Sequence, residues 1–556
     1  MSLTVFNFWK MKKLIPIIIV LLFAGECFSQ APNWAWAKSA GGGGAINGRD
    51  VAIDNSGNVI VTGSFWGDSM HFGAITLVNY FYPEDDIVIA KYNGAGTILW
   101  AKRIGAGSSD FGKSVITDNS GNIYLTGESD GSFPTFGSVT ATGTGDMFIV
   151  KYDSLGNEIW AKWYPAVANG IACDLAGNII VTGYFLNSTT FGSTTLTCAG
   201  GADIFVAKFD SSGNVLWAKS AGGNDNDEGT SICTDNSGNI MVTGYFSSPS
   251  ITFDTTTLIN TGISPTSDVF VTKFDSLGNV LWAKSAAGNN SDSGSGIAND
   301  NNGNVFITGT FKSPTIDFDS TILTNDSSGY SDIFTVKYDM GGNLMWAKSA
   351  GGIQNDGPGS IATDPNGNAI IAGYFISTVL TFPPITITNA SFPNGDVFIM
   401  KYDSLGNVVW AEDYGEAGDE RIYITTDAIG NIAVTGGFSY PSINFGANTL
   451  TSSGGTADLF VAKTDITTGI PTFPRSEEKI TISPNPFTNS TTITLPTTNN
   501  QQLTTITITD VLGKEIKTLH FTGNECVIEK GDMERGIYFV RVNSKQGIVN
   551  RKIVIQ

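Results

Sequence analysis

Residues 220–284 read SAGGNDNDEGTSICTDNSGNIMVTGYF (220–246), then a looser stretch containing ITFDTTTLIN (251–260), then SDVFVTKFDSLGNVLWAK (267–284). Variants of this module fill most of the chain, and the Trp-Ala pair near its end recurs every 57–65 residues. The seven tryptophans of these pairs are Trp36, Trp100, Trp160, Trp217, Trp282, Trp346 and Trp410. A fixed period of this length predicts a repeat architecture, in which each module is one structural unit.

Each module contains four apolar runs of strand length, bounded by Gly, Asn, Asp and Ser. In the module quoted above these runs cover 231–234, 240–246, 269–274 and 280–284. No window shows a sustained helical period, so the module is all-β. The first two runs are joined by Asp-x-x-Gly-Asn and the last two by a similar turn, and both turns are typical of hairpins. We therefore predict a four-stranded antiparallel sheet with strands a, b, c and d in chain order.

The order of strands is offset at the two ends of the repeat region. The first strand d, around Trp36, precedes every strand a, and no strand d follows Lys463. Repeated four-stranded sheets are typical of β-propellers, and pairing of the chain ends would remove two unpaired sheet edges. We predict a seven-bladed β-propeller over residues 30–465, closed by the amino-terminal strand. The stretch DEGTSICTDNSGNIMVTGYF resembles the SBBP-type β-propeller repeat of bacterial extracellular proteins.

The amino terminus has the pattern of a secretory signal peptide. Residues 11–30 read MKKLIPIIIVLLFAGECFSQ, with two lysines, an apolar run and then small and polar residues. The run is shorter than a membrane-spanning helix needs. We predict a start at Met11 and cleavage between Ser29 and Gln30, so that residues 1–29 are removed. Cys27 leaves a lipoprotein open as an alternative, although Glu26 stands where that cleavage motif requires a small residue.

Charge and side-chain chemistry exclude several classes of function. A formal net charge of −20 disfavours nonspecific binding of nucleic acid. Four cysteines follow the signal peptide without metal-ligand or redox spacing, so we expect buried free thiols. The two histidines, His71 and His520, lie in different domains, which leaves little material for a zinc site or a Ser-His-Asp triad.

The repeat stops at residue 466, and a linker is predicted over 466–478, followed by a small immunoglobulin-like β-sandwich over 479–556. Four motifs mark this tail: Pro484-Asn485-Pro486-Phe487, Asp510-Val-Leu-Gly513-Lys514, Gly536-Ile-Tyr538-Phe, and a basic-apolar end that begins at Lys552. They resemble the type A carboxy-terminal sorting domain of the Bacteroidetes type IX secretion system. The resemblance implies export through the Sec translocon to the periplasm, then passage by the type IX machinery, with release or attachment to surface lipopolysaccharide. An ordinary immunoglobulin-like adhesion domain is the alternative.

Candidate binding residues lie where blades depart from the repeat. The long b–c and d–a connections share one end of each sheet, and binding residues gather on loops held by a rigid scaffold. The last blade carries Glu412, Glu416, Glu420, Arg421 and Tyr423 there, and the neighbouring first blade adds Arg49. These groups could bind a sugar acid or supply the acid pair of a glycosidase, and Trp163 and Tyr164 could stack on sugar rings. Sequence drift near the closing seam explains the same cluster without a function.

An aspartate recurs eight residues before the Asp that opens the a–b turn, at Asp110, Asp227, Asp292, Asp356 and Asp419. A ring of carboxylates could bind calcium, which prefers several oxygen ligands. The same residue would also recur as a turn cap in any repeated scaffold, and this second interpretation is the one we adopt. We therefore predict no cofactor, with calcium as the alternative.

Taken together, the sequence predicts a secreted or outer-membrane-surface β-propeller that acts as a monomeric, noncatalytic binding or adhesion module for a glycan or a protein. One alternative is a carbohydrate-active enzyme, a glycoside hydrolase or lyase, that uses carboxylates on the b–c/d–a loop face. The other is a structural scaffold without a dedicated ligand.

Overall fold

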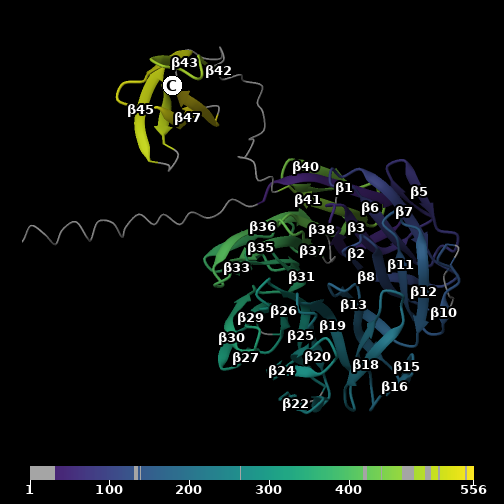
Figure 1. Cartoon of the computed structure of the whole chain (residues 1–556). Helices are drawn as coiled ribbons and strands as arrows, with labels where there is room; N and C mark the ends of the chain where they lie inside the picture. The colour runs from purple at the N-terminus through teal and green to yellow at the C-terminus, as the bar shows by residue number, and fades with distance from the viewer. Residues whose placement is uncertain are drawn as a thin grey trace, which may run out of the picture. The chain divides into compact units, whose positions relative to one another are not determined.

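The computed structural model describes residues 32–130, 135–137, 139–262, 265–327, 329–416, 422–439, 441–465, 481–494, 503–510, 514–544 and 547–556. All regular elements in these ranges are β-strands. The described residues contain no helix long and apolar enough to cross a membrane. The chain divides into two compact units, Met1–Ile466 and Thr467–Gln556 (Figure 1). The predicted signal peptide, with Ser29 and Gln30, and the predicted linker lie outside the described residues.

The first unit contains sheets built on one plan, in which four consecutive long strands lie side by side in chain order, each antiparallel to the next. The module quoted above forms one of them, with β19 (Asp227–Thr234), β20 (Ile240–Phe246), β23 (Asp268–Phe274) and β24 (Val280–Ala286) as strands a to d. Four further sheets before and after it are β2 (Ala45–Ile53), β3 (Val59–Trp66), β6 (Asp86–Tyr92) and β7 (Ile98–Ile104); β13 (Val167–Cys173), β14 (Ile179–Phe185), β17 (Asp203–Phe209) and β18 (Val215–Ala221); β25 (Asp292–Asn299), β26 (Val305–Phe311), β29 (Asp332–Tyr338) and β30 (Leu344–Ala350); and β31 (Asp356–Thr363), β32 (Ala369–Phe375), β35 (Asp396–Tyr402) and β36 (Val408–Glu416).

Two sheets extend this plan. The second sheet along the chain adds the short β10 (Thr142–Gly143), parallel to its outer strand, to β8 (Asp110–Thr117), β9 (Ile123–Ser129), β11 (Met147–Tyr152) and β12 (Glu158–Tyr164). The last sheet contains β37 (Tyr423–Thr426), β38 (Ile432–Phe438), β41 (Asp458–Thr464) and β1 (Trp34–Gly42), and it continues from the end of β1 into β4 (Ser69–Phe72) and β5 (Ile75–Val78). Here β1 pairs antiparallel with β41, with Trp36 opposite Lys463 and Ala40 opposite Leu459. The predicted pairing of the amino-terminal strand with the last strand c is therefore confirmed.

The first strands of successive sheets form a closed series. β2 contacts β8, and contacts then run from β8 through β13, β19, β25 and β31 to β37, which contacts β2 again. Figure 1 shows these strands around one centre, with the later strands of each sheet farther out. The side chains of strand a therefore line the middle of this unit.

The b–c connections differ from the sequence-based expectation. They were predicted only to be long and variable, but six of them hold a regular hairpin among the described residues. The hairpins are β4 (Ser69–Phe72) with β5 (Ile75–Val78), β15 (Ser188–Phe191) with β16 (Thr194–Thr197), β21 (Ser250–Phe253) with β22 (Thr256–Ile259), β27 (Thr315–Phe318) with β28 (Thr321–Thr324), β33 (Val379–Phe382) with β34 (Ile385–Thr388), and β39 (Ser442–Phe445) with β40 (Asn448–Thr451). They contact the outermost strands, for example β21 with β18 and β22 with β24. Their apolar side chains fill the gaps between neighbouring sheets, so these connections do not surround the centre.

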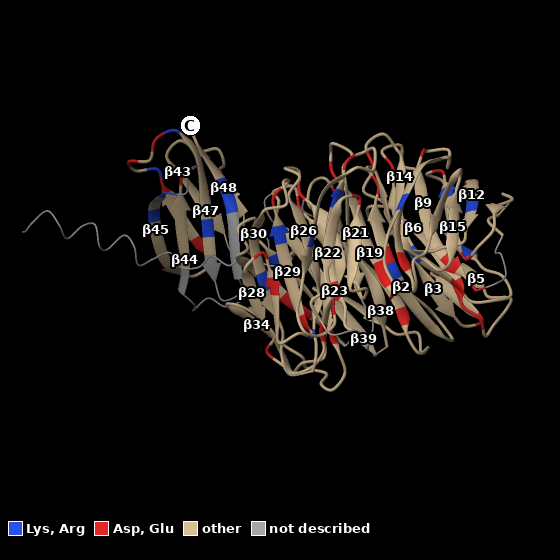
Figure 2. Cartoon of the chain, turned by 90° about the horizontal axis from the view of Figure 1, so that it is seen from below, with Lys and Arg blue, Asp and Glu red and all other residues tan. Residues whose placement is uncertain are grey.

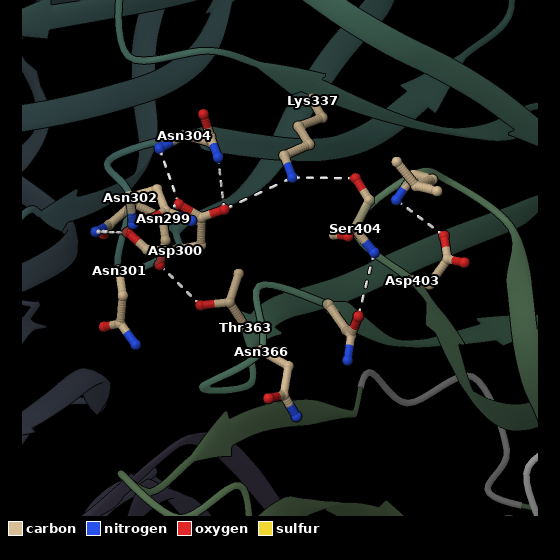
Figure 3. Close-up of polar contacts among 12 residues, drawn as sticks. Asn299, Asp300, Asn301, Asn302, Asn304, Lys337, Thr363, Asn366, Asp403 and Ser404 are labelled. Atoms are coloured by element: carbon tan, nitrogen blue, oxygen red, sulfur yellow. Dashed lines mark hydrogen bonds and ion pairs between the residues drawn. The ribbon is translucent and has the colours of Figure 1, made fainter.

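Buried lysines join neighbouring sheets at the end where the tight turns lie, as Lys337 does in Figure 3. The Nζ of Lys337 lies 3.6 Å from the Asp300 carboxylate and donates to the Ser404 carbonyl of the next sheet at 3.1 Å. Asp300 in turn accepts hydrogen bonds from the backbone and side chain of Asn304, which closes the a–b turn. The Asp and Lys of the repeat are therefore structural residues, because a buried charge is tolerated only when it is paired and hydrogen-bonded.

The second unit also has only strands among its described residues. One sheet contains β42 (Thr481–Ser483), β43 (Ser490–Thr494) and β46 (Glu525–Glu529), and the other contains β45 (Glu515–Thr522), β44 (Leu503–Thr509), β47 (Gly536–Ser544) and β48 (Gly547–Ile555). Ile493 of the first sheet and Val540 and Ile553 of the second share one buried core.

The predicted sorting motifs of this unit form turns and hydrogen-bond those turns to neighbouring strands. Asn485 donates to the Lys552 carbonyl at 2.8 Å and accepts from the Val554 amide, which ties the Pro484–Pro486 turn to the last strand. Asp510 accepts from the Lys514 amide at 2.9 Å, and the Tyr538 hydroxyl donates to the Glu534 carbonyl. Gly536 begins β47, and Gly513 lies outside the described residues. All four cysteines after the predicted signal peptide are free thiols and half-buried.

Candidate functional site

A β-bulge recurs in strand a of six sheets. In the module quoted above the pairing of β19 with β20 slips between Gly229 and Ser231, so that Thr230 has no partner across the ladder. A bulge re-aims a side chain and is often found beside binding sites. The bulged residues are Arg49, Lys113, Asn169, Thr230, Ser295 and Gly359.

All six bulged residues line a channel at the centre of the first unit. Two adjoining hollows share these residues and Tyr423. One hollow, of about 390 Å³, lies along the second halves of the first strands, among residues such as Thr117 and Thr234. The other, of about 620 Å³, lies among the ends of the b strands and the d–a connections, for example at Tyr374 and Asn355. Both volumes fall in the range of small-ligand sites, about 300–1,000 Å³.

Arg49 brings a cation into this channel, and Asp85 lies near enough for the Arg49 charge to oppose the rise of the Asp85 pKa that burial causes. Its Nε atom is buried and has no hydrogen-bond partner among the described residues. Its guanidinium carbon lies 5.7 Å from the centroid of the Phe111 ring, which also lies 5.7 Å from the Lys113 Nζ. Lys113 forms an ion pair with Glu128 at 2.6 Å, whereas no carboxylate in the described ranges lies within ion-pair distance of Arg49. Arg49 is therefore able to accept an external anion.

Asp50 holds the two basic bulges next to each other. Its carboxylate accepts hydrogen bonds from the Ser114 hydroxyl at 2.6 Å and from the Val115 amide at 2.8 Å, both on β8. Burial raises the pKa of Asp50 to about 6, and these hydrogen bonds oppose the rise. The carboxylate joins β2 to β8 directly beside Arg49 and Lys113, which fixes their spacing.

The wider hollow is lined mainly by hydroxyl, amide and aromatic side chains. Tyr245, Tyr374 and Tyr423 lie in its wall together with Glu228 and Lys312. Burial and a hydrogen bond to Glu228 raise the pKa of Tyr245, so its hydroxyl stays protonated at neutral pH. This wall offers both hydrogen bonds and ring surfaces to a polar ligand.

The candidate binding residues predicted from the last and first blades do not all lie together in the structure. Arg49 and Tyr423 line the channel, but Glu412 does not. Glu412 lies on the outer strand β36, accepts a hydrogen bond from the Tyr414 hydroxyl at 3.0 Å, and has its pKa raised by burial. Tyr414 packs against Trp34 of β1, so Glu412 belongs to the closing seam. Asp419, Glu420 and Arg421 lie outside the described residues, as does the side chain of Glu416.

Trp163 and Tyr164 are core residues in the structure, with exposed fractions of 4% and 8%. Trp163 packs on Phe136 and Phe148, and Tyr164 stacks on Phe191 with ring centroids 5.0 Å apart. Their ring faces are covered by these neighbours, so the prediction that they stack on sugar rings is not kept. The strand they share ends at the loop face, but its side chains point into the cores on either side.

The recurring aspartates act within their own turns. Asp227 is fully buried and accepts hydrogen bonds from the Ser248 hydroxyl at 2.7 Å and from the backbone amides of Gly223, Ser247 and Ser248. Asp292 and Asp356 have the equivalent serine partners, and Asp110 accepts from the Ala106 amide. Burial raises the pKa of Asp292 to about 7 and those of Asp110, Asp227 and Asp356 to about 6. Within the described ranges no three His, Cys, Asp or Glu side chains are grouped to hold a metal, and calcium binding stays a prediction.

Two family matches agree with these observations. Residues 481–556 match the secretion system C-terminal sorting domain, and residues 99–134 match a beta-propeller repeat of the SBBP type. The first unit is therefore a β-propeller with SBBP repeats. The tail is a type IX sorting domain, which marks a secreted or surface-exported protein of the Bacteroidetes and implies interaction with the secretion machinery.

Matches to whole proteins are more distant. An uncharacterized WD repeat-containing protein of Acanthamoeba polyphaga mimivirus is 26% identical over 508 residues, which cover 74% of this chain and 36% of that protein. The regulatory protein FlaEY of Caulobacter vibrioides is 29% identical over 178 residues, 31% of this chain and 18% of that protein. The chain thus spans about a third or less of the length of these relatives.

Among solved structures, lignostilbene dioxygenase of Pseudomonas brassicacearum aligns with a TM-score of 0.37 at 8% identity, over 76% of this chain and 91% of that one. Sqt1 of Chaetomium thermophilum aligns with a TM-score of 0.35 at 9% identity, over 73% and 97% of the two chains.

Proposed function

We propose that this protein is an exported, noncatalytic binding module whose ligand enters the central channel. In this proposal the seven sheets are the blades of a seven-bladed propeller, and the tail is an immunoglobulin-like sandwich. The Sec translocon and the periplasm supply the first step of export, and surface lipopolysaccharide is the anchor if the protein stays on the cell.

The bulge series is the observation that carries the proposal. Residues that recur in every module make turns or join sheets, as Asp300 and Lys337 do. The bulged position instead holds a different residue in each of the six sheets, and all six residues line the channel, five of them with a side chain. A rigid scaffold that presents varied side chains to one cavity is the usual arrangement of a binding protein.

The carboxylates in the channel favour binding over catalysis. Asp50 is occupied by a hydroxyl and two backbone amides, those of Val51 and Val115. Glu228 is engaged by Tyr245. A glycosidase needs two carboxyl groups that face each other across the scissile bond. Because Asp50 and Glu228 are each held by these hydrogen bonds, they do not form such a pair.

The test uses the full-length protein and channel-filling variants. The intact protein is screened on arrays of immobilised polysaccharides and proteins, and each hit is repeated with Thr230→Trp and Ser295→Trp. Leu277→Trp is the matched control, because Leu277 is 72% exposed in a c–d turn at the opposite end of the sheets. We expect the channel variants to lose binding and the control to keep it. If the channel variants still bind the ligand, the binding site lies outside the channel. Turnover of any polysaccharide by the intact protein would support the enzyme alternative instead.

A further inference from the structure

We infer that the channel ligand is an acidic saccharide of the uronate class, which enters end-on and places a carboxylate on Arg49. This inference rests on the proposed function and names its ligand class.

The lining of the channel differs in charge from the chain as a whole. The chain as a whole is acidic, with 51 Asp and Glu against 31 Lys and Arg. Asp and Glu residues lie in many of the turns as well as along strands (Figure 2). Arg49, Lys113 and Lys312 line the wider hollow, and Glu228 is the one acidic residue among its described lining residues. Behind this lining Glu128 pairs with Lys113 and Asp85 lies near Arg49, so the positive charge of the wall itself is what faces the hollow. A cationic cavity in an anionic protein selects an anion.

Arg49 has the geometry to bind a carboxylate. A guanidinium offers a planar fork of donors that matches a carboxylate, and contact with an aromatic ring fixes its orientation. Phe111 provides that contact at 5.7 Å, and the buried Nε has no partner in the described part of the chain. Leaving a buried charged donor unpaired is costly, so an incoming carboxylate would remove this penalty.

The side chains around the cations suit a saccharide better than other anions. Around the cations the wall carries the short polar side chains of Asn169, Thr230 and Ser295. Asn169 and Thr230 donate to the Gly229 and Gly294 carbonyls, so their oxygens are left to accept hydrogen bonds from sugar hydroxyls. Three tyrosines in the same wall provide faces and hydroxyl groups, and aromatic side chains with a polar end serve both kinds of contact. Because the first strands close the channel on all sides, a chain can enter only by its end.

The experiment measures binding of trisaccharides to the full-length protein by calorimetry. The probes are trigalacturonate, triglucuronate and the neutral trisaccharides of the same linkage, with a triglutamate peptide as a further anion. We expect a uronate to bind at least tenfold more tightly than its neutral counterpart and than the peptide. Arg49→Met should weaken uronate binding about ten- to hundredfold, the range for a hydrogen-bonded charge pair.

Lys348→Met is the matched control, since it removes one positive charge from an exposed position on the outer strand β30. It should leave uronate binding unchanged, and the melting temperatures of both variants show that they are folded. Equal binding of acidic and neutral trisaccharides that Ser295→Trp abolishes would overturn the uronate assignment and leave the channel as the site. Preference for triglutamate, or no binding of any uronate, would also overturn it. Uronate binding that survives both Arg49→Met and Ser295→Trp would refute the channel itself.

Discussion

At the scale of single residues, the charged side chains of the repeat stabilise the fold and one departure from the repeat forms the candidate site. Lys337 and Asp300 are almost fully buried and bond to each other and to the next sheet. Arg49 is also partly buried, yet its Nε lacks a partner among the described residues. Chemically similar cations therefore have different roles, and the difference is whether the fold supplies a partner.

Lys337→Met should lower the free energy of unfolding by about 3 kcal/mol, because it leaves the Asp300 carboxylate buried without its cation. Chemical denaturation of the full-length protein measures the change. Lys348→Met, an exposed loss of the same charge, should change stability by less than about 0.5 kcal/mol. Adding Asp300→Asn to Lys337→Met should restore part of the loss; a double variant less stable than Lys337→Met would contradict this account.

At the scale of elements, the bulge explains a glycine that the repeat requires in strand b. A Cβ added to Gly309 would lie 2.1 Å from the Ser293 carbonyl, and one added to Gly244 would lie 2.0 Å from the Glu228 carbonyl. The bulge brings these carbonyl oxygens over the neighbouring strand. The Thr-Gly pair of the module is therefore needed to keep the bulge, and with it the direction of the channel side chains.

Gly309→Ala should destabilise the protein by about 1–3 kcal/mol, the usual cost of overpacking, and should weaken ligand binding through displacement of Ser295. Gly43→Ala is the control, since its Cβ would meet its nearest atom at an ordinary 3.6 Å. Thermal unfolding and the binding assay are measured on both variants. Wild-type stability in Gly309→Ala would show that the bulge is not held in this way.

Most of these elements could be predicted from sequence. The Asp-x-x-Gly-Asn turns, the four long strands and the β1–β41 pairing followed from local patterns, since turn chemistry and alternation act over a few residues. The b–c hairpins were missed because their strands have four residues each, too short for a periodic signal. Arg49 and Tyr423 were found because they break the repeat. Lys113 and Asn169 were missed because the bulge was not recognised from the sequence. The bulge shows in strand a as two successive residues that are not fully buried, between the buried Gly229 and the buried Ile232.

At the scale of the whole molecule, two sets of aspartates give stability opposite dependences on pH. Burial raises the pKa of Asp292 and Asp332 to about 7 and that of Asp268 to about 6, all above the value of 3.8 for a free side chain. The native state then binds more protons than the unfolded state between about pH 4 and 7, so stability falls as pH rises through this window. The turn aspartates, such as Asp174 and Asp235, have lowered pKa values and lose their contribution as pH falls below about 4.

The melting temperature should therefore be highest between about pH 4 and 5 and should fall by several degrees towards pH 8. Calorimetry across this range measures the profile. Asp292→Asn should flatten its upper part, because the amide cannot ionise, while Asp235→Asn should flatten only the acid side. A melting temperature that rises from pH 5 to pH 8 would contradict the assignment.

Removal of residues 479–556 should prevent surface display or release and leave the propeller unit inside the cell envelope, since the sorting domain is the part that matches a secretion signal. Fractionation of cells that express the full-length and truncated proteins measures this. A variant with Leu277→Trp, far along the chain from the tail, should be exported normally. Unchanged display of the truncated protein would rule out the tail as the export signal.

The pairing of β1 with β41 also determines the order in which the propeller can be completed. Trp34 donates a hydrogen bond to Tyr414, 380 residues away in sequence. During synthesis from the amino terminus, Trp34 and its neighbours therefore stay without their partner strand until nearly the whole unit has been made. Closure of such a long loop must precede the contacts that reward it, so we expect the final sheet to assemble last. Circular permutation tests this directly: if residue 465 is joined to residue 32 and new ends are made between two other sheets, the slow step moves to the new junction.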